Sequence, residues 1–338
     1  MYSFKNDYSE GCHPNILDTL TKTNFDQQEG YGDDEYSKQA KELIREKIQN
    51  SNAEIYFVSG GTQANLIIIA AALKPYESVI SAKSGHINVH EAGAIESTGH
   101  KVEPIETSDG KLTTEKIQVI LDGFENHHMA RPKMVYISNS TELGTIYKKA
   151  ELEKLSSFCR NKNLYLFLDG ARLGSALCAE DNDITLADLA KFTDAFYIGG
   201  TKNGALLGEA IVINNDELKK DFLFHIKQRG ALMSKGRTIG IQFLELFKND
   251  LFFQLAKHAN VMAMKITKAV KEKGYSFLTE STSNQIFPIL PNELIEKLSS
   301  KYEFYVWKKL DDKTSAIRLV TSWATKEEFV DAFIADLG

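Results

Sequence analysis

The sequence predicts an α/β protein that has a large domain around a mostly parallel sheet and a small α+β C-terminal domain. From residue 53 to about 213, short apolar and β-branched runs alternate with helical segments, which is typical of a sheet with helices on its faces. Residues 238–273 form a long helical stretch that ends at Gly274. We therefore expect an N-terminal segment and large domain in residues 1–240, and a connecting helix and small domain in residues 241–338.

Six apolar runs are the expected strands of the large sheet. Most of them are apolar on both faces, as strands covered by helices on both sides are. They are residues 54–58, 78–81, 133–138, 164–169, 194–198 and 210–213. Before them, residues 36–49 carry an apolar stripe at helical spacing and predict a helix. In the small domain we expect strands at residues 284–290, 303–307 and 316–320 and a closing helix at 326–337.

The composition excludes several classes of partner. The 338 residues are 43% hydrophobic, and 40 basic against 46 acidic residues give a net charge of −6 with no long block of either sign. We therefore expect a small-molecule substrate and no binding to nucleic acid or anionic lipid.

Cys12, Cys159 and Cys178 have no metal-binding spacing, so neither disulfides nor a metal site is expected. The absence of a signal-like N-terminus and of a membrane-length apolar run favours the cytoplasm.

A glycine loop lies between the first expected strand of the sheet and an apolar helix. It reads Ser59-Gly-Gly-Thr-Gln-Ala-Asn65, and Gly60, Gly61 and Thr62 would present backbone N–H groups at the helix N-terminus. Such a terminus can hold a phosphate. A plain strand-to-helix turn is the structural alternative for this motif alone.

Two further residues follow buried strands at the same expected edge of the sheet. Asp169 ends one strand, and Lys202 lies 33 residues later in a loop of small residues, with Thr201 beside it. A pyridine cofactor needs an acid against its ring nitrogen, and a buried lysine can form a Schiff base. Asp169 could instead pair with Arg172, and Lys202 could be a surface lysine. Their joint position favours one ligand pocket, in which Thr201 could bind the phosphate.

His86 follows another strand of the sheet, where an imidazole could stack on a cofactor ring and assist proton transfer. His90 is its competitor, and a structural hydrogen-bonding role is the alternative for either histidine.

Together these segments resemble the low-specificity L-threonine aldolase and β-eliminating lyase family of fold-type I pyridoxal-phosphate enzymes. The resemblance covers nearly the whole chain. Its motifs are Tyr31-Gly-Asp-Asp34, Gly61-Thr-Gln-Ala-Asn65, His86 before Glu91-Ala-Gly93, Asp169-Gly-Ala-Arg172, Lys202 before Gly208, and Arg318-Leu-Val-Thr321. It implies the fold-type I transferase fold and the cofactor pyridoxal 5'-phosphate.

The resemblance also implies roles for residues. Lys202 would bind the cofactor covalently, Asp169 would pair with its ring nitrogen, and His86 would stack on the ring. The phosphate would lie on Gly60, Gly61 and Thr62. Arg172, counted among the cofactor contacts as well, and Arg318 would grip the substrate carboxylate. A homodimer or homotetramer with sites at the subunit interface is implied, so Tyr31 and Arg237 would reach a neighbour's site.

The sequence departs from the family pattern at two places. Ser140-Thr-Glu142 stands where the family usually has Asn-Thr-His, so Glu142 would replace a histidine near the substrate hydroxyl. Asn6-Asp-Tyr8 stands where the family has Ser-Asp-Thr, which makes Asn6 a candidate substrate contact.

The activity that this resemblance implies is retro-aldol cleavage of L-threonine or L-allo-threonine to glycine and acetaldehyde, with Glu142 as a candidate base. The nearest alternative keeps Lys202 and the cofactor but carries out β-elimination or transamination. Two further alternatives are a cofactor-holding protein without catalysis and an α/β protein without a cofactor.

Overall fold

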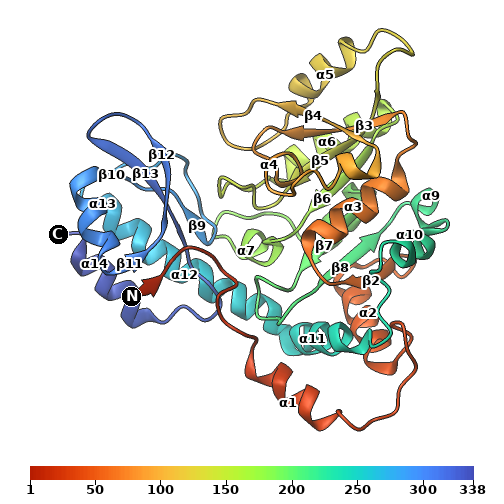
Figure 1. Cartoon of the computed structure of the whole chain (residues 1–338), viewed down its shortest axis with the longest axis horizontal. Coiled ribbons are helices and arrows are strands. Elements are labelled where there is room, and N and C mark those ends of the chain that lie inside the picture. Colours follow the sequence, from red (N-terminus) through yellow and green to blue (C-terminus); the bar gives the residue numbers. More distant parts are fainter.

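Seven strands form the central sheet in the computed structural model, which describes residues 1–338 (Figure 1). In spatial order they are β2 (Glu54–Val58), β8 (Glu209–Ile213), β7 (Ala195–Gly199), β6 (Tyr165–Asp169), β5 (Arg131–Ser138), β3 (Glu77–Ala82) and β4 (Lys101–Ile105). Strand β8 is antiparallel to both of its neighbours, and the other pairs are parallel. The predicted mostly parallel α/β sheet is confirmed.

Strand β4 was not among the predicted strands, for a physical reason. Its sequence, Lys-Val-Glu-Pro-Ile, alternates and contains Pro104, whereas the predicted strands are continuous apolar runs. Proline removes a ladder hydrogen bond and is tolerated on an edge strand. Strand β4 pairs only with β3, at the edge of the sheet.

Alternate residues of each strand enter two separate cores, one on each face of the sheet. On β6, Leu166 and Leu168 belong to one core and Phe167 to the other. The same alternation on β5 and β7 places Tyr136 and Tyr197 on the face of Phe167. Because side chains along a strand alternate between faces, Asp169 ends β6 on this face too.

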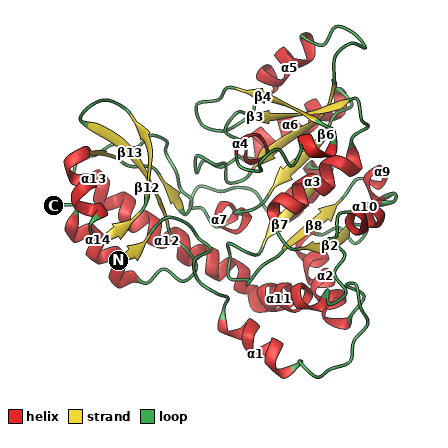
Figure 2. Cartoon of the chain, in the orientation of Figure 1, coloured by secondary structure: helices red, strands yellow, loops and turns green.

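Helices cover both faces of the sheet (Figure 2). The face of Phe167 carries α3 (Gly61–Ala72), α4 (His86–Val89), α9 (Asp216–Lys219) and α10 (Phe222–Gln228). The other face carries α2 (Glu35–Ile48), α5 (Thr114–Asp122), α6 (Lys149–Asn161), α7 (Leu173–Leu177), α8 (Leu186–Phe192) and α11 (Arg237–Phe247). Helix α1 (Pro14–Lys22) packs against α11, and a 3-10 turn, η1 (Glu96–Thr98), precedes β4.

The C-terminal part has its own sheet and its own core. Strands β10 (Ile289–Pro291), β13 (Thr314–Val320) and β12 (Tyr305–Lys309) are antiparallel, and β9 (Gln285–Ile286) also pairs with β13. Helices α12 (Leu251–Glu272), α13 (Asn292–Ser299) and α14 (Glu327–Asp336) complete it. No helix of the structure combines the length and apolar character that crossing a bilayer requires.

The N-terminus lies beside the C-terminal part (Figure 1). Strand β1 (Tyr2–Ser3) pairs in parallel with β11 (Tyr302–Glu303), and Phe4 is fully buried in the C-terminal core. The boundary at residue 240 stays a prediction. Residues 2–4 of the chain pack with the C-terminal part, although they were assigned to the same unit as the large domain.

The predicted helical stretch at 238–273 is broken in the structure. Helix α11 ends at Phe247, a 3-10 turn η2 (Lys248–Asp250) follows, and α12 begins at Leu251. Asn249 and Asp250 have φ values of 56° and 58°. Asparagine and aspartate tolerate this left-handed conformation better than most residues, so the chain can bend here between the two parts.

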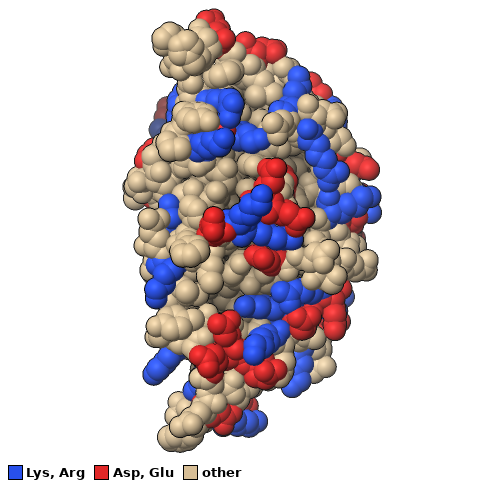
Figure 3. All heavy atoms as spheres, turned by 90° about the vertical axis from the view of Figure 1, so that its right-hand side faces the viewer, with Lys and Arg blue, Asp and Glu red and all other residues tan.

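Charged side chains of both signs are mixed on the face shown in Figure 3. Where charged side chains gather in that view, many lysine and arginine side chains lie next to aspartate and glutamate, and no broad surface of one sign is visible.

Candidate active site

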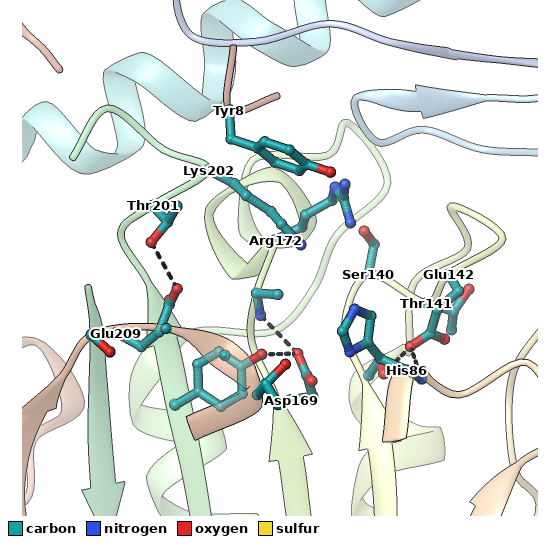
Figure 4. A pocket seen from close by; sticks show the side chains of 17 residues that line it. Tyr8, His86, Ser140, Thr141, Glu142, Asp169, Arg172, Thr201, Lys202 and Glu209 are labelled. Atoms are coloured by element: carbon teal, nitrogen blue, oxygen red, sulfur yellow. Dashed lines mark hydrogen bonds between the residues drawn. The ribbon is translucent and has the colours of Figure 1, made fainter. Parts of the chain in front are cut away.

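A cavity of about 340 Å³ opens where the carboxyl ends of β5, β6 and β7 meet the loop after β2 (Figure 4). It collects predicted catalytic and cofactor-binding residues from five separate segments of the chain. They are Gly60, Gly61, Thr62, His86, Glu142, Asp169, Arg172, Thr201 and Lys202. An adjoining cavity of about 470 Å³ shares Lys202, His86, Glu142 and Arg172 and is also lined by Arg318.

Lys202 extends into this cavity from the loop after β7 (Figure 4). Burial, and then the nearby charge of Arg172, lower the pKa of its amine; the charges of Asp7, Asp169 and Glu209 oppose this shift. A lowered pKa makes the unprotonated amine more available, and only that form is a nucleophile. Lys202 is therefore suited to bind an aldehyde covalently.

Asp169 is fixed at the floor of the cavity by four donors. Tyr197 Oη and the amide of Ala171 donate to Oδ1, at 2.5 and 2.9 Å. Tyr136 Oη and Asn65 Nδ2 donate to Oδ2, at 2.6 and 3.1 Å. Burial, and then the charge of Asp169, raise the pKa of both tyrosines well above the ordinary value, so they remain donors.

The imidazole of His86 is oriented by a buried carboxylate. His86 Nδ1 lies 2.8 Å from Glu91 Oε1, which also accepts a hydrogen bond from Asn65 Nδ2 at 2.7 Å. Asn65 therefore links Glu91 to Asp169 through its two hydrogen bonds. The position of the His86 ring consequently depends on the position of Asp169. His90, the alternative candidate, lies 5.6 Å from His86 between ring centroids and lines the adjoining cavity.

The N-terminus of α3 faces the cavity without a side-chain cap. Its first N–H groups are therefore available to an anion such as a phosphate. Gly61 is needed here for space, because a Cβ at this position would lie 2.9 Å from Tyr197 Oη.

Glu142 lies on the side of the cavity opposite Thr201 (Figure 4). Its Oε1 accepts from the His86 amide at 2.9 Å and from Ser138 Oγ at 2.8 Å, which leaves Oε2 without a hydrogen bond. Burial, and then the charge of Asp169, raise the pKa of Glu142. A carboxylate with a raised pKa is a better proton acceptor near neutral pH.

The two predicted carboxylate-binding arginines differ in the structure. Arg172 forms a bidentate ion pair with buried Asp7, with Nε–Oδ2 and Nη2–Oδ1 distances of 2.7 and 3.0 Å. Arg318 packs on Tyr305 and Trp307, donates to the carbonyl of Lys5, and has a buried Nε with no partner. Arg318 is thus the arginine that has a buried donor without a partner, whereas Asp7 already holds Arg172.

Two predicted substrate residues lie away from the cavity in the single chain. Asn6 Oδ1 accepts hydrogen bonds from the Tyr8 amide and Ser9 Oγ. Tyr31 is 49% exposed and lines a different surface pocket. Arg237 donates to the carbonyls of Asn24 and Asp26.

Several residues that line the cavities or hold their lining side chains were not predicted. Tyr8 lines both cavities, and Asp7, Tyr136, Tyr197 and Glu209 hold predicted residues. Asp7 and Tyr8 stand in the Asn6-Asp-Tyr8 motif, and Glu209 directly follows Gly208, but nothing in the sequence assigned roles to them. Their roles depend on contacts between distant segments.

These residues fit the groups of pyridoxal 5'-phosphate: an amine for its aldehyde, an acid for its ring nitrogen and an uncapped helix for its phosphate. With the topology of the sheet, they define a fold-type I pyridoxal-phosphate enzyme.

Comparison with known proteins identifies the family. Residues 8–291 match the family model described as "Beta-eliminating lyase". A low-specificity L-threonine aldolase of Pseudomonas aeruginosa is 30% identical, over 99% of this chain and 96% of that protein. The chain belongs to the β-eliminating lyase family, whose enzymes use pyridoxal phosphate.

Solved structures agree with the assignment. A threonine aldolase of Leishmania major is 49% identical and superposes with a TM-score of 0.98. The match covers 100% of this chain and 98% of that protein. An aspartate aminotransferase of Thermus thermophilus, at 15% identity, a TM-score of 0.73 and coverage of 99% and 90%, shares the fold alone.

Proposed function

We propose that this protein is a low-specificity threonine aldolase that cleaves L-threonine or L-allo-threonine to glycine and acetaldehyde. The observation that carries the proposal is the position of Lys202, whose amine lies in one cavity with Asp169 and an uncapped helix N-terminus. The similarity to threonine aldolases along nearly the whole chain supports the carbon–carbon lyase reaction.

The residues of the cavity would hold the cofactor at its different groups. Lys202 would hold it covalently, Asp169 at the ring nitrogen, and His86 at the ring face. Gly60, Gly61 and Thr62 would hold the phosphate. When bound, the cofactor supplies an electron-withdrawing ring that stabilises the negative charge left on the α-carbon after a bond to it breaks.

The chain's own residues bind and orient the amino acid. Arg318 binds the substrate carboxylate through its free donors, beside Arg172. This grip fixes which bond of the α-carbon is broken. Glu142 takes the proton of the substrate β-hydroxyl on Oε2, and the loss of that proton permits cleavage of the bond between Cα and Cβ.

The test begins with the absorption spectrum of the purified protein before and after borohydride, followed by acetaldehyde assays with both threonine isomers. We expect a visible band that borohydride abolishes while it fixes the cofactor to Lys202, and acetaldehyde from at least one isomer. Lys202→Ala should lose both, and Lys83→Ala, at an exposed lysine outside the cavity, should keep both. A wild-type protein with the band but no aldehyde would contradict the aldolase reaction.

One observation favours β-elimination as a second candidate. The group expected near the substrate hydroxyl is a buried carboxyl, Glu142, with a raised pKa. In its protonated form it could donate a proton to a leaving group on the β-carbon. Pyruvate and ammonia from O-acetylserine, without glycine, would identify this reaction.

We also propose that the chain forms a homodimer or homotetramer. Tyr31 and Leu223 share a surface pocket and are 49% and 47% exposed, and Phe25 and Phe224 are 93% and 74% exposed. Tyr31, Leu223 and the adjacent Phe224 support the proposal, because neighbouring exposed apolar side chains are typical of subunit interfaces. Light scattering after gel filtration tests the assembly.

The cytoplasmic location stays a prediction, which cell fractionation would test.

A further inference from the structure

Glu209 is a buried carboxyl between the two loops that are expected to bind the cofactor. It is the first residue of β8, and its neighbours in register are Val58 on β2 and Gly199 on β7. The phosphate loop follows Val58, and the loop of Lys202 follows Gly199. Because β8 lies between β2 and β7, Glu209 is located between the starts of these two loops.

The hydroxyl of Thr201 is already used by this carboxyl. Thr201 Oγ1 lies 2.9 Å from Glu209 Oε1 (Figure 4) and accepts a hydrogen bond from the Gly208 amide at 3.0 Å. Glu209 Oε2 accepts from the Gly200 amide at 3.1 Å. A hydroxyl has one proton to donate. If Glu209 is ionised, Thr201 donates that proton to it and has none for a phosphate.

A proton on Glu209 reverses this hydrogen bond. Protonated Oε1 donates to Thr201 Oγ1, while Oε2 still accepts from the Gly200 amide. The hydroxyl of Thr201 is then free to donate into the cavity, and every donor and acceptor in the cluster has a partner. Only the protonated form of Glu209 therefore lets Thr201 serve a phosphate.

We propose that Glu209 binds a proton from solvent when the cofactor phosphate binds, and that this proton turns Thr201 into a hydrogen-bond donor to the phosphate. The inference rests on the proposed function, because it requires that the cavity takes pyridoxal phosphate. It makes Glu209 a positioning residue that acts through Thr201.

The surroundings of Glu209 favour this protonation. Burial raises the pKa of its carboxyl, the charge of Lys202 opposes the shift, and the charge of Asp169 adds to it. The titratable groups that face Glu209 are Lys202 after β7, Asp169 on β6 and Tyr197 on β7; on β2 its neighbour is the apolar Val58. A phosphate dianion would favour the uncharged acid further, since like charges repel.

The probe for the test is pyridoxamine 5'-phosphate, which has no aldehyde and so binds without a covalent bond to Lys202. We would measure its Kd by fluorescence from about pH 7 to about pH 10, for wild type and Glu209→Gln. Glutamine is the matched control, because its amide donates to Thr201 and accepts from Gly200 at every pH. Between the pKa of Glu209 in the free protein and its higher pKa in the complex, the ratio of wild-type Kd to variant Kd should rise by up to about tenfold per pH unit.

Two further measurements isolate the phosphate. With pyridoxamine, which lacks it, the ratio should stay constant over the same pH range. Thr201→Val should weaken binding of the phosphate ester and remove most of the difference between wild type and Glu209→Gln. The ³¹P resonance of the bound probe in wild type should titrate at a higher pH than the one at which the Kd ratio begins to rise, because the bound phosphate raises the pKa of Glu209. The resonance should not titrate in Glu209→Gln.

The outcomes separate the two proposals. Equal pH dependence in wild type and Glu209→Gln overturns the role of Glu209, while binding of pyridoxal 5'-phosphate by wild type would leave the proposed function standing. No binding of pyridoxal 5'-phosphate by wild type overturns both. If Glu209→Gln fails to fold, the ³¹P titration of wild type against Thr201→Val decides, and equal titration in these two proteins overturns the proposal.

Discussion

Each charged side chain of the cavity, except Arg318, is either paired or held largely uncharged by burial. This difference separates the role of Arg318 from the roles of the others. Asp7 neutralises Arg172, four donors hold Asp169, and burial favours the uncharged forms of Lys202 and Glu142. Arg318 alone combines a positive charge with a buried donor that has no partner. Binding of an anionic substrate beside Arg318 would give its positive charge a partner.

Glu142→Gln tests the proton acceptor. We expect kcat for threonine cleavage to fall by about 10²–10⁴-fold, since glutamine cannot accept the hydroxyl proton. The wild-type rate should rise with pH through the raised pKa of Glu142, and the variant should lose this limb. Steady-state kinetics across pH, together with the glycine-dependent spectrum, measure both effects. Ser138→Ala removes one hydrogen bond to Glu142 and serves as the control, with a much smaller loss expected. An active Glu142→Gln with the wild-type pH profile would contradict the role.

Asp7→Asn tests the buried ion pair. Burial raises the pKa of Asp7, but the charges of Arg172 and Lys202, together with hydrogen bonds from Arg172 and Asn284, outweigh burial and lower it overall. The stability from this pair is complete above the unfolded pKa of about 3.9, and it is lost as the pH falls through the lower folded-state pKa. At neutral pH, urea unfolding should show a loss of about 3–5 kcal/mol, because Arg172 is left buried and unpaired.

The control breaks an ion pair that another residue of the N-terminal segment, Lys5, forms near the surface. Glu303→Gln breaks the ion pair of Lys5 and Glu303, whose side chains are 36% and 42% exposed. Pairs of this kind contribute about 0–1 kcal/mol. Equal losses for Asp7→Asn and Glu303→Gln would show that burial of the Asp7 pair adds nothing.

At the scale of elements, helices and strands that leave a pattern within their own segment were predicted well. Features that leave little pattern in their own segment were missed. Continuous apolar runs located six strands of the large sheet because burial on both faces leaves a local signal. The break at Asn249 and Asp250 was missed, since a left-handed turn of two residues barely disturbs helical periodicity. Strand β4 was missed because edge strands need not be apolar on both faces.

Gly61→Ala tests the junction of α3 with the sheet. The new Cβ would meet Tyr197 Oη at 2.9 Å and displace the donor that holds Asp169. Crowding of this kind costs about 1–3 kcal/mol. Gly60→Ala is the matched control, because a Cβ there meets nothing within 4 Å and its φ of −174° suits any residue. Chemical unfolding of the cofactor-free proteins should destabilise Gly61→Ala alone, and similar values for both variants would contradict the argument.

At the scale of the whole molecule, the sequence predicted which residues gather but not how they are supported. Asp169 and Lys202 could be placed together because parallel strands bring their carboxyl ends to one edge. The pairing of Asp7 with Arg172 joins positions 165 residues apart. The position of Glu209 depends on β8 lying between β2 and β7, an order that no local pattern encodes. Support from distant segments therefore had to come from the structure.

The last prediction concerns the assembly. Tyr31 lies outside its own chain's cavity, so we expect it to complete the site of a neighbouring subunit. Lys202→Ala and Tyr31→Ala should each lose most activity. Coexpression should then restore up to about one quarter of it, because a mixed dimer contains one site with both residues intact. Coexpressed Lys202→Ala and Glu142→Gln provide the control, since these residues line the cavity of one chain and no mixed dimer regains a complete site. Recovery in the control pair, or none with Tyr31→Ala, would contradict a site shared between subunits.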